Sequence, residues 1–409
     1  MQHCHVLIVG GGPTGLVLGC LLAMGGVEVV VLERRSYPRK YSRAIGLHPP
    51  ALAVLQVLGL EATALAEGTR VQAGTAYRRG RPLGSLSFEQ AWPERPFVLT
   101  LPQNRTEALL AQRLRQLAPQ ALHQGWQVTQ ITDPTDSHAG VQVIARNVSN
   151  GSDGTTERSW RADIVVGADG PHSLVRRTAG IGTRARNLAD TYLMGDLAHH
   201  TTGTDQLLPT VAAIFLETTG VIESFPLPGQ MRRWVVHTGT QLKDESQHLL
   251  TQLIAERTGE QLDPSSWTML SAFHVRRRIA QHMAVGRCVI VGDAAHEVSP
   301  IGGQGMTLGW LDAIDLAPLL SHVVASHTPT PLDQLASFQQ FEHTRLAAAQ
   351  AAARQAELNM ALGRPMPTFA AAMRDVGLKT ILATKMRHRL AKAFTMRKPL
   401  GGSEVHLPQ

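Results

Sequence analysis

The chain has 409 residues, of which 43% are hydrophobic and 17% charged, and its formal net charge at pH 7 is +7. These values are typical of a large globular protein with a substantial core, and they exclude a disordered or fibrous chain. Its three cysteines are odd in number and lack metal-ligand spacing, so we expect free thiols, a reducing cytoplasmic location and no metal site. No secretory pattern and no uninterrupted apolar run of about 20 residues is found, which argues against a signal peptide and a membrane span.

The N-terminal segment predicts a strand, a glycine-rich turn, a helix and a second strand. Residues 5–9 form an apolar run of strand length, GGGPTG follows at residues 10–15, and residues 27–32 form a second apolar run that ends at Glu33. This order is typical of a dinucleotide-binding βαβ unit.

Each residue of this turn has a physical role in such a unit. Gly10 permits the sharp turn, Gly12 lets the backbone approach a pyrophosphate, and Gly15 lets the helix pack closely on the strand. Glu33 can accept hydrogen bonds from the ribose hydroxyls of an adenosine. The predicted cofactor-binding residues of this region are Gly10, Gly12, Pro13, Thr14, Gly15, Glu33 and Arg34.

A second carboxylate follows an apolar run in the segment 164–173, where Asp169 ends a predicted strand. Alone, this segment could be an ordinary Asp–Gly turn. In its place behind the N-terminal unit, it indicates a further contact to the same ligand.

The segment 292–306 (GDAAHEVSPIGGQGM) is the most informative part of the chain. It follows a short apolar run and precedes a helical pattern over residues 306–320, so it predicts a strand, a turn that presents Asp293, and a glycine-rich helix entry. Asp293 can hydrogen-bond a polyol hydroxyl, and the helix start offers free N–H groups and partial positive charge. Such a site suits an isoalloxazine, which carries a sugar-like chain and becomes anionic on reduction.

The three motifs, in this order, resemble those of the single-component FAD-dependent aromatic hydroxylases, the para-hydroxybenzoate hydroxylase-like class A monooxygenases, over about residues 5–320. Two smaller segments extend the resemblance. In the family, the arginine of the segment matching 42–49 lies near the flavin, and the glutamine of the segment matching 101–107 contacts the ribityl chain. The motifs and the resemblance together predict flavin contacts at Arg43, Gln103, Asp169, Asp293, Pro300, Gly302, Gly303, Gln304, Gly305 and Met306.

The resemblance implies a monooxygenase that binds FAD and uses NAD(P)H and dioxygen. Through a C4a-hydroperoxyflavin it would hydroxylate an electron-rich aromatic or polyketide-type substrate. NAD(P)H is expected to bind transiently, because the chain has one dinucleotide fingerprint. Arg43 and His296 are the candidates for a catalytic role, although a histidine in this setting more often makes a structural hydrogen bond.

Two alternatives remain at this point. One is a flavin-dependent reductase or epoxidase acting on an isoprenoid or quinone-like substrate. The other is a non-catalytic interaction protein that binds flavin as a structural element. A flavin-dependent halogenase is not favoured, because no two tryptophans stand two positions apart.

The fold class predicted is α/β: a Rossmann-like FAD-binding domain, an inserted antiparallel-sheet substrate domain and C-terminal helices. The predicted domains are residues 1–70, 98–180 and 275–340 for FAD, 71–97 and 181–274 for the substrate sheet, and 341–409 for the helical region.

The predicted substrate sheet contains strands at 213–217, 221–226 and 233–237, followed by a helix at 246–257. Its aromatic residues are candidates for the substrate pocket, although core packing is the more common role for such side chains. Arg232 or Arg233 could meet an acidic substrate. The aromatic candidates are Tyr192, Phe215, Phe225 and Trp234.

Residues 364–409 hold nine basic against two acidic residues, which accounts for the whole net charge of +7. Apolar residues recur there every four positions, which predicts one basic amphipathic helix. We favour packing of this helix on the core over peripheral contact with an anionic membrane or an acidic partner. Nucleic acid is not expected, because no aromatic residues alternate with the charges. The apolar residues are Leu378, Leu382, Met386, Leu390 and Phe394.

Overall fold

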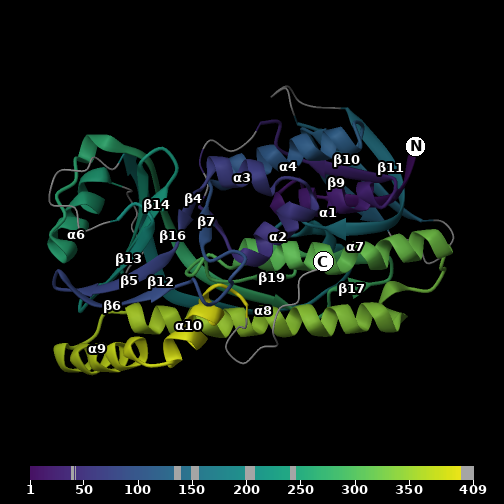
Figure 1. The fold of residues 1–409 in the computed structure, drawn as a ribbon. Helices are drawn as coiled ribbons and strands as arrows, with labels where there is room; N and C mark the ends of the chain where they lie inside the picture. The colour runs from purple at the N-terminus through teal and green to yellow at the C-terminus, as the bar shows by residue number, and fades with distance from the viewer. Residues whose placement is uncertain are drawn as a thin grey trace.

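The computed structural model describes residues 1–37, 41, 43–132, 140–148, 156–198, 208–239 and 246–397, so Ser42 of the predicted flavin-proximal segment lies outside them. Two large sheets lie next to each other, with long helices running along both (Figure 1). The predicted α/β fold is confirmed.

The first sheet is mainly parallel. Its strands are buried on both faces, as expected for apolar runs of this kind: Leu7, Ile8 and Val31 are fully buried, and Val30 nearly so. Helix α1 (Pro13–Met24) packs against α4 (Gln103–Leu117) and α7 (Gly305–Ser326). The parallel strands, in spatial order, are β18 (Cys288–Ile290), β11 (Glu157–Gly167), β1 (Gln2–Val9), β2 (Val29–Glu33) and β8 (Leu122–Gln124). Antiparallel additions are β17 (Ala284–Val285), β9 (Trp126–Thr132) and β10 (Val141–Asn147).

The second sheet is antiparallel except where β13 (Val211–Glu217) runs parallel to β5 (Ala73–Arg78). Residues 71–97 contribute two of its strands, and the domain boundary predicted at 274/275 falls inside the strand β16 (Trp267–Ala280). The strands of this second sheet lie in the order β19 (His296–Glu297), β16 (Trp267–Ala280), β12 (Thr183–Ala198), β15 (Met231–His237), β14 (Gly220–Leu227), β13 (Val211–Glu217), β5 (Ala73–Arg78) and β6 (Arg81–Ser87).

One face of this second sheet packs against α6 (Gln247–Thr258), and the other faces inward (Figure 1). Phe215 and Trp234 belong to the core under α6, together with Leu250 and Ile254 of that helix. Because side chains alternate along a strand, the residues next to Phe215 and Trp234 in the sequence point to the face away from α6.

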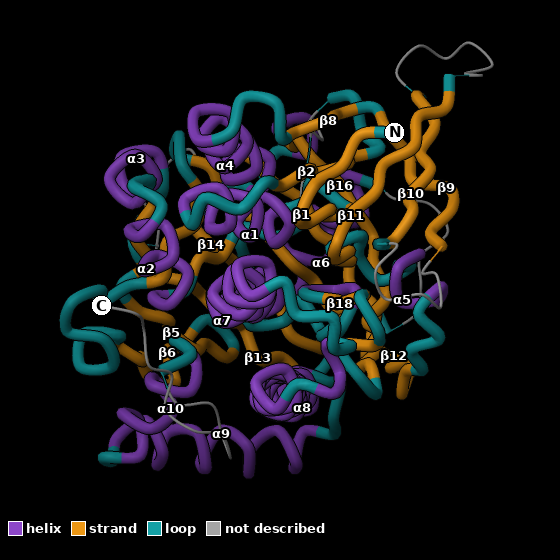
Figure 2. The backbone as a smooth tube through the Cα atoms, turned by 90° about the vertical axis from the view of Figure 1, so that its right-hand side faces the viewer, coloured by secondary structure: helices purple, strands orange, loops and turns teal. Residues whose placement is uncertain are grey.

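The remaining elements connect and brace the two sheets. Helix α8 (Ala336–Gly363) runs beneath α7, and the two are seen close to end-on in Figure 2. The other elements are β3 (Gly46–Leu47), β4 (Thr69–Val71), β7 (Val98–Thr100), α2 (Pro49–Val57), α3 (Glu61–Glu67), α5 (Leu174–Thr178), and 3₁₀ turns at Pro264–Ser266, Gly292–Ala294 and Leu332–Gln334.

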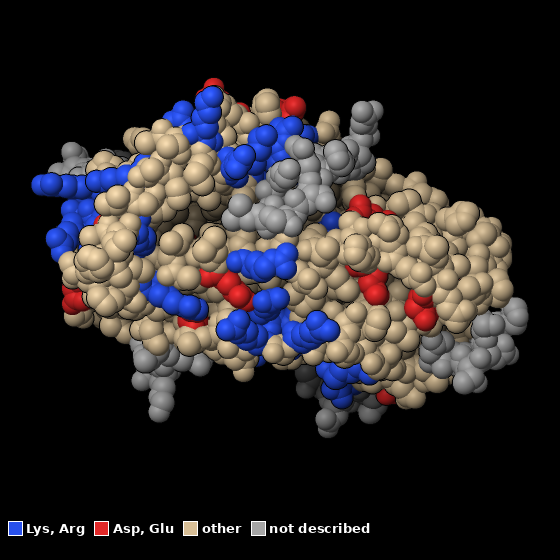
Figure 3. Space-filling model, turned by 90° about the horizontal axis from the view of Figure 1, so that it is seen from below, with Lys and Arg blue, Asp and Glu red and all other residues tan. Residues whose placement is uncertain are grey.

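The prediction of one C-terminal amphipathic helix is wrong. The structure has two helices, α9 (Thr368–Ala383) and α10 (Met386–Phe394), because the backbone at Thr384 is extended. Of the predicted apolar face only Met386, beside the break, is strongly exposed; the other four residues line an internal cavity. These four residues therefore point toward the protein interior, in the direction that the packing prediction favours. Basic side chains remain on the outside, as the view from below shows (Figure 3).

Helix α7 is long and apolar enough to cross a membrane by length and composition, and it is the one helix of this kind among the described residues. Its sequence includes Asp312, which is fully buried and paired with two basic side chains, His296 and Arg345. These contacts mark α7 as a helix of the protein core.

Candidate active site

The carboxyl ends of four parallel strands meet at one edge of the first sheet. Val9 pairs with Gly167 on one side and with Leu32 on the other, and Gly167 pairs with Ile290. The residues at or just after these ends include the predicted ligand contacts Gly10, Glu33, Asp169 and Asp293. Ligands of open α/β sheets bind at this edge.

The glycine turn is shaped for a ligand that approaches the backbone. Gly10 has a φ of +108°, and a Cβ on Gly15 would lie 2.0 Å from the Gly10 carbonyl oxygen. A Cβ on Gly12, in contrast, would meet nothing within 4 Å, because Gly12 borders open space in front of the N-terminus of α1. This leaves room for an anionic group at the positive end of the helix.

Two of the three carboxylates at this edge also hold the local backbone. Glu33 accepts hydrogen bonds from the Gly11 N–H at 2.7 Å and the Arg35 N–H at 2.9 Å. Asp169 accepts one from the Leu174 N–H at 2.6 Å, which caps α5, while its Oδ1 is buried without a partner among the described residues. Burial raises the pKa of Asp169. An unsatisfied buried oxygen is costly unless a ligand or water donates to it.

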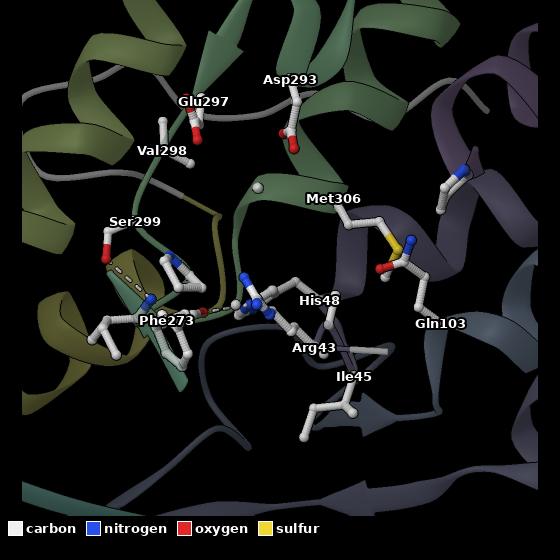
Figure 4. Close-up of a pocket in the computed structure, with 18 of the residues that line it drawn as sticks. Arg43, Ile45, His48, Gln103, Phe273, Asp293, Glu297, Val298, Ser299 and Met306 are labelled. Carbon is white, nitrogen blue, oxygen red and sulfur yellow. Dashed lines mark hydrogen bonds between the residues drawn. The ribbon is translucent and has the colours of Figure 1, made fainter. Parts of the chain in front are cut away.

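Asp293 has no hydrogen-bond partner among the described residues, and its carboxylate opens into the cavity (Figure 4). Enclosure by the surrounding protein raises its pKa to about 6. A hydroxyl donor from a bound ligand would stabilise the ionised form and return the pKa to a lower value.

The glycine loop before α7 is fixed by His48, which lies between the loop and the C-terminal helix α10. The Nε2 of His48 donates to the Gly302 carbonyl oxygen at 3.0 Å, and its ring meets the Phe394 ring edge-on at 5.9 Å. Burial lowers the pKa of His48 to about 4, so the imidazole is neutral at neutral pH. Gly302 and Gly303 both have positive φ, which turns the loop sharply before the helix begins.

Arg43 is held over the same space by the second sheet. Its Nε donates to Ser271 Oγ at 3.2 Å, and its guanidinium lies 5.7 Å from the centre of the Phe273 ring. Figure 4 shows Arg43 and His48 between Phe273 on one side and Gln103 on the other. The site thus carries a positive charge near the predicted flavin edge.

His296 is not placed for catalysis, and its candidacy is corrected by the structure. Its Nε2 lies 2.6 Å from Asp312 Oδ2, and the side chain does not border the cavity. Asp312 also binds Arg345 Nε at 2.7 Å and accepts the Gly292 N–H at 2.9 Å. Burial alone would raise the pKa of Asp312, but His296 and Arg345 outweigh it and hold this pKa at about 2. The cluster fixes the backbone directly before Asp293.

One large cavity, of about 1210 Å³, joins this edge to the inward face of the second sheet. Gly15 and Gln304 do not border it: Gly15 packs against the Gly10 carbonyl, and Gln304 Nε2 donates to the Ala393 carbonyl of α10 at 3.4 Å. The predicted contacts that line the cavity are Gly10, Gly12, Pro13, Thr14, Glu33, Arg34, Arg43, Gln103, Asp169, Asp293, Pro300, Gly302, Gly303, Gly305 and Met306.

The aromatic candidates of the second sheet separate by face. Tyr192 and Phe225 line the cavity, whereas Phe215 and Trp234 point to the core under α6. Arg233 also lines the cavity, but it forms a two-point ion pair with Asp196, at 2.6 and 2.7 Å. Arg232 is buried and donates to Ser224 Oγ at 2.9 Å, away from the cavity.

Sequence reasoning missed two contributions to the cavity. One is Glu223 on β14, a carboxylate on an otherwise apolar face. The other is the wall formed by α9 and α10, where Leu382 lies so close to Gly84 of β6 that a Cβ there would be 2.7 Å from Leu382 Cδ1. The four-residue spacing of apolar residues in the sequence identified the apolar face of α9 and α10, but it did not show that this face lines the cavity.

The strand-end edge fits FAD on the observations above. Open space before the Gly12 backbone suits a pyrophosphate, the unsatisfied Asp169 oxygen and the unpartnered Asp293 suit hydroxyl donors, and Glu33 stands at the end of β2.

Comparisons with known proteins agree with this geometry. A family profile described as an FAD binding domain matches residues 3–356. The chain is 33% identical over 332 residues to 6-methylpretetramide 4-monooxygenase of Streptomyces rimosus; the match covers 79% of this chain but 56% of that protein, so the chain spans little more than half of that relative's length. It is 28% identical over 411 residues to the 12-dehydrotetracycline 5-monooxygenase/anhydrotetracycline 6-monooxygenase of Streptomyces rimosus subsp. rimosus, covering 97% of this chain and 78% of that one.

A solved structure gives the same fold. The p-nitrophenol 4-monooxygenase of Pseudomonas putida DLL-E4 superposes with a TM-score of 0.84, over 99% of this chain and 100% of that one, at 21% identity. At this identity, the likeness concerns the fold alone.

Proposed function

The chain belongs to the family of FAD binding domains, and from this membership we propose that it is an FAD-dependent monooxygenase that hydroxylates an electron-rich aromatic or polyketide-type ring with NAD(P)H and dioxygen. The single observation that carries this proposal is the continuity of the cavity. It runs from the strand-end edge, where the cofactor contacts gather, to an enclosed apolar face of the second sheet.

When bound, FAD supplies acceptance of a hydride from NAD(P)H and activation of dioxygen. The chain's own residues supply the setting for this chemistry. The start of α1 would favour the pyrophosphate, and Asp293 would accept a hydrogen bond from a ribityl hydroxyl. His48, which stays neutral, keeps the Gly302–Gly303 turn in place, and the Arg43 guanidinium favours negative charge that develops on the reduced ring.

The inward face of the second sheet is suited to a flat apolar substrate. Met194, Ile214, Phe225 and Val235 line it, and Leu378 of α9 covers it from the other side. These walls would limit the access of water to the reacting centre. The two Streptomyces relatives named above carry tetracycline-type substrates in their names, which supports a polycyclic aromatic ring as the substrate class.

Oxygen-dependent consumption of NAD(P)H tests the proposal. The purified protein, loaded with FAD, should oxidise NADH or NADPH faster when a phenolic, quinolone or polyketide ring is added in air. Without dioxygen, oxidation should stop once the bound flavin is reduced. Continued anaerobic turnover with a quinone-like substrate would instead support a reductase, and failure of both nicotinamides to reduce the flavin with any ring would support a non-catalytic role.

A further inference from the structure

Glu223 is an acidic side chain on the apolar face of the second sheet, and it borders the cavity. It lies in the middle of β14, where its cross-strand neighbours are Ile214 on β13 and Val235 on β15. Val221 and Phe225, two positions away on the same strand, line the cavity beside it. Valine or isoleucine would complete this surface, so an acid there is unexplained by folding.

No hydrogen bond or ion pair to Glu223 is formed among the described residues. Two other polar groups belong to the same wall. Arg233 on β15 is paired with Asp196, whereas Tyr192 on β12 has a buried hydroxyl that is also without a partner among the described residues. The Tyr192 ring stacks on Phe273 at 5.4 Å, which fixes its position. Enclosure raises the pKa of Glu223 to about 7, and burial, followed by the nearby Glu223 charge, raises the pKa of Tyr192.

We propose that Glu223 is a specificity-determining residue that accepts a hydrogen bond from a phenolic or enolic hydroxyl on the substrate ring. This inference rests on the proposed function and assigns a substrate class to the same site. A carboxylate accepts such a bond more strongly than a neutral group does. Its charge also disfavours benzoate-type anions, so the site selects hydroxylated, uncharged rings.

The hydrogen bond also has a chemical consequence. As the hydroxyl proton is drawn toward Glu223, electron density moves from the phenol oxygen into the ring, and no bond is broken in this step. An electron-rich ring is the better acceptor of an electrophilic oxygen. Glu223 thus positions and polarises the substrate from the wall of the cavity formed by the second sheet.

Binding of two matched probes to the FAD-loaded protein tests the proposal without turnover. 2-Naphthol donates a hydrogen bond, whereas 2-methoxynaphthalene has nearly the same shape and cannot. Perturbation of the flavin absorbance reports both affinities. At pH 8, we expect the wild type to prefer 2-naphthol by at least tenfold. Glu223→Leu should abolish this preference by weakening 2-naphthol alone, and Glu223→Gln should reduce it severalfold.

Glu217→Gln is the matched control. Glu217 ends the neighbouring strand β13, accepts the Arg79 N–H at 2.7 Å and does not border the cavity. This variant should keep the wild-type preference. An unchanged preference in Glu223→Leu, or equal binding of the two probes by the wild type, would overturn the proposal.

The pH dependence of the preference separates Glu223 from its surroundings. The strands on both sides of it present Ile214 and Val235, and α9 presents Leu378, so none of these positions titrates. Other ionisable groups that border the same cavity, among them Tyr192, Arg43, His48, Arg233, Asp293 and Glu297, all remain in the variants. The wild-type preference should rise between pH 6 and pH 8 as Glu223 ionises, and the preference of Glu223→Gln should stay flat.

The same titrations distinguish this inference from the proposed function. A Glu223-dependent preference without oxygen-dependent turnover would sustain the hydroxyl-recognition site and defeat the monooxygenase proposal. Turnover of hydroxylated rings with an unchanged preference in Glu223→Leu would support the monooxygenase proposal and overturn the hydroxyl-recognition site. Absence of binding of both probes to the wild type would overturn the assignment of phenols to this cavity.

Discussion

Replacing Gly15 with alanine should prevent the protein from folding stably, whereas replacing Gly12 with alanine should leave the fold intact and weaken FAD binding. The two positions are three residues apart in the same turn but have opposite surroundings. A Cβ at position 15 would lie 2.0 Å from the Gly10 carbonyl oxygen, far inside contact distance, and the backbone of β1 or α1 would have to move. We expect a loss of more than about 3 kcal/mol in the free energy of unfolding.

The Gly12→Ala substitution separates an effect on FAD binding from an effect on folding. An added methyl group there meets no protein atom within 4 Å and enters the space assigned to the pyrophosphate. Urea unfolding of Gly12→Ala without added FAD should match the wild type, while FAD titration followed by flavin fluorescence should show at least tenfold weaker binding, or about 1.4 kcal/mol. Unchanged FAD affinity would show that the cofactor does not approach this turn.

Replacing Asp312 with alanine should destabilise the protein by about 3–5 kcal/mol, because it leaves buried basic groups without their acid. Arg345 and His296 are both buried, and the Gly292 N–H would lose its acceptor as well. Since Gly292 precedes Asp293, FAD affinity should fall together with stability.

Asp315→Ala is the control for this substitution. Asp315 lies one turn further along α7, its side chain is 44% exposed, and its contact with Arg345 is 3.5 Å long. We expect a change of less than about 1 kcal/mol. Thermal or urea unfolding of both variants at about pH 6 is the measurement, and equal stability of the two variants would contradict the assigned role of Asp312.

The choice of pH follows from the direction of each pKa shift. The folded pKa of Asp312, about 2, lies below its unfolded value of about 3.9, so its contribution is present above that value and is lost as the pH falls toward 2. For His296, burial alone would lower the pKa, but Asp312 outweighs burial and the net pKa is raised. Its contribution is therefore present below about pH 6.5 and is lost as the pH rises through the folded pKa. Both contributions are present at about pH 6.

The cofactor edge could be predicted because its signals are local. The turn after β1 depends on residues within a few positions of one another, and each glycine there has a surrounding that matches its predicted role. The carboxylates at the strand ends could be assigned to one ligand site because parallel strands bring their carboxyl ends to one edge of the sheet. Asp293 and Asp169 were found from single short segments.

The substrate side could not be predicted in the same way, because it depends on contacts between distant segments. The break at Thr384 turns one predicted helix into two, and only the packing of α9 on β6 decides which side faces the cavity. Gln304 lies in the glycine segment but turns to α10 instead. Both faces of β14 are largely apolar, so alternation alone did not show that Glu223 faces the cavity; a lone acid amid an apolar strand was the available signal.

Isotopic labelling of the product tests the central claim most directly. The FAD-loaded protein, supplied with NAD(P)H and a ring that stimulates its oxidation, is allowed to react under ¹⁸O-labelled dioxygen, and the product is analysed by mass spectrometry. A monooxygenase places one labelled oxygen atom in the hydroxylated ring and releases the other as water. A product whose added oxygen comes from unlabelled water, or a ring recovered without added oxygen, would contradict the account.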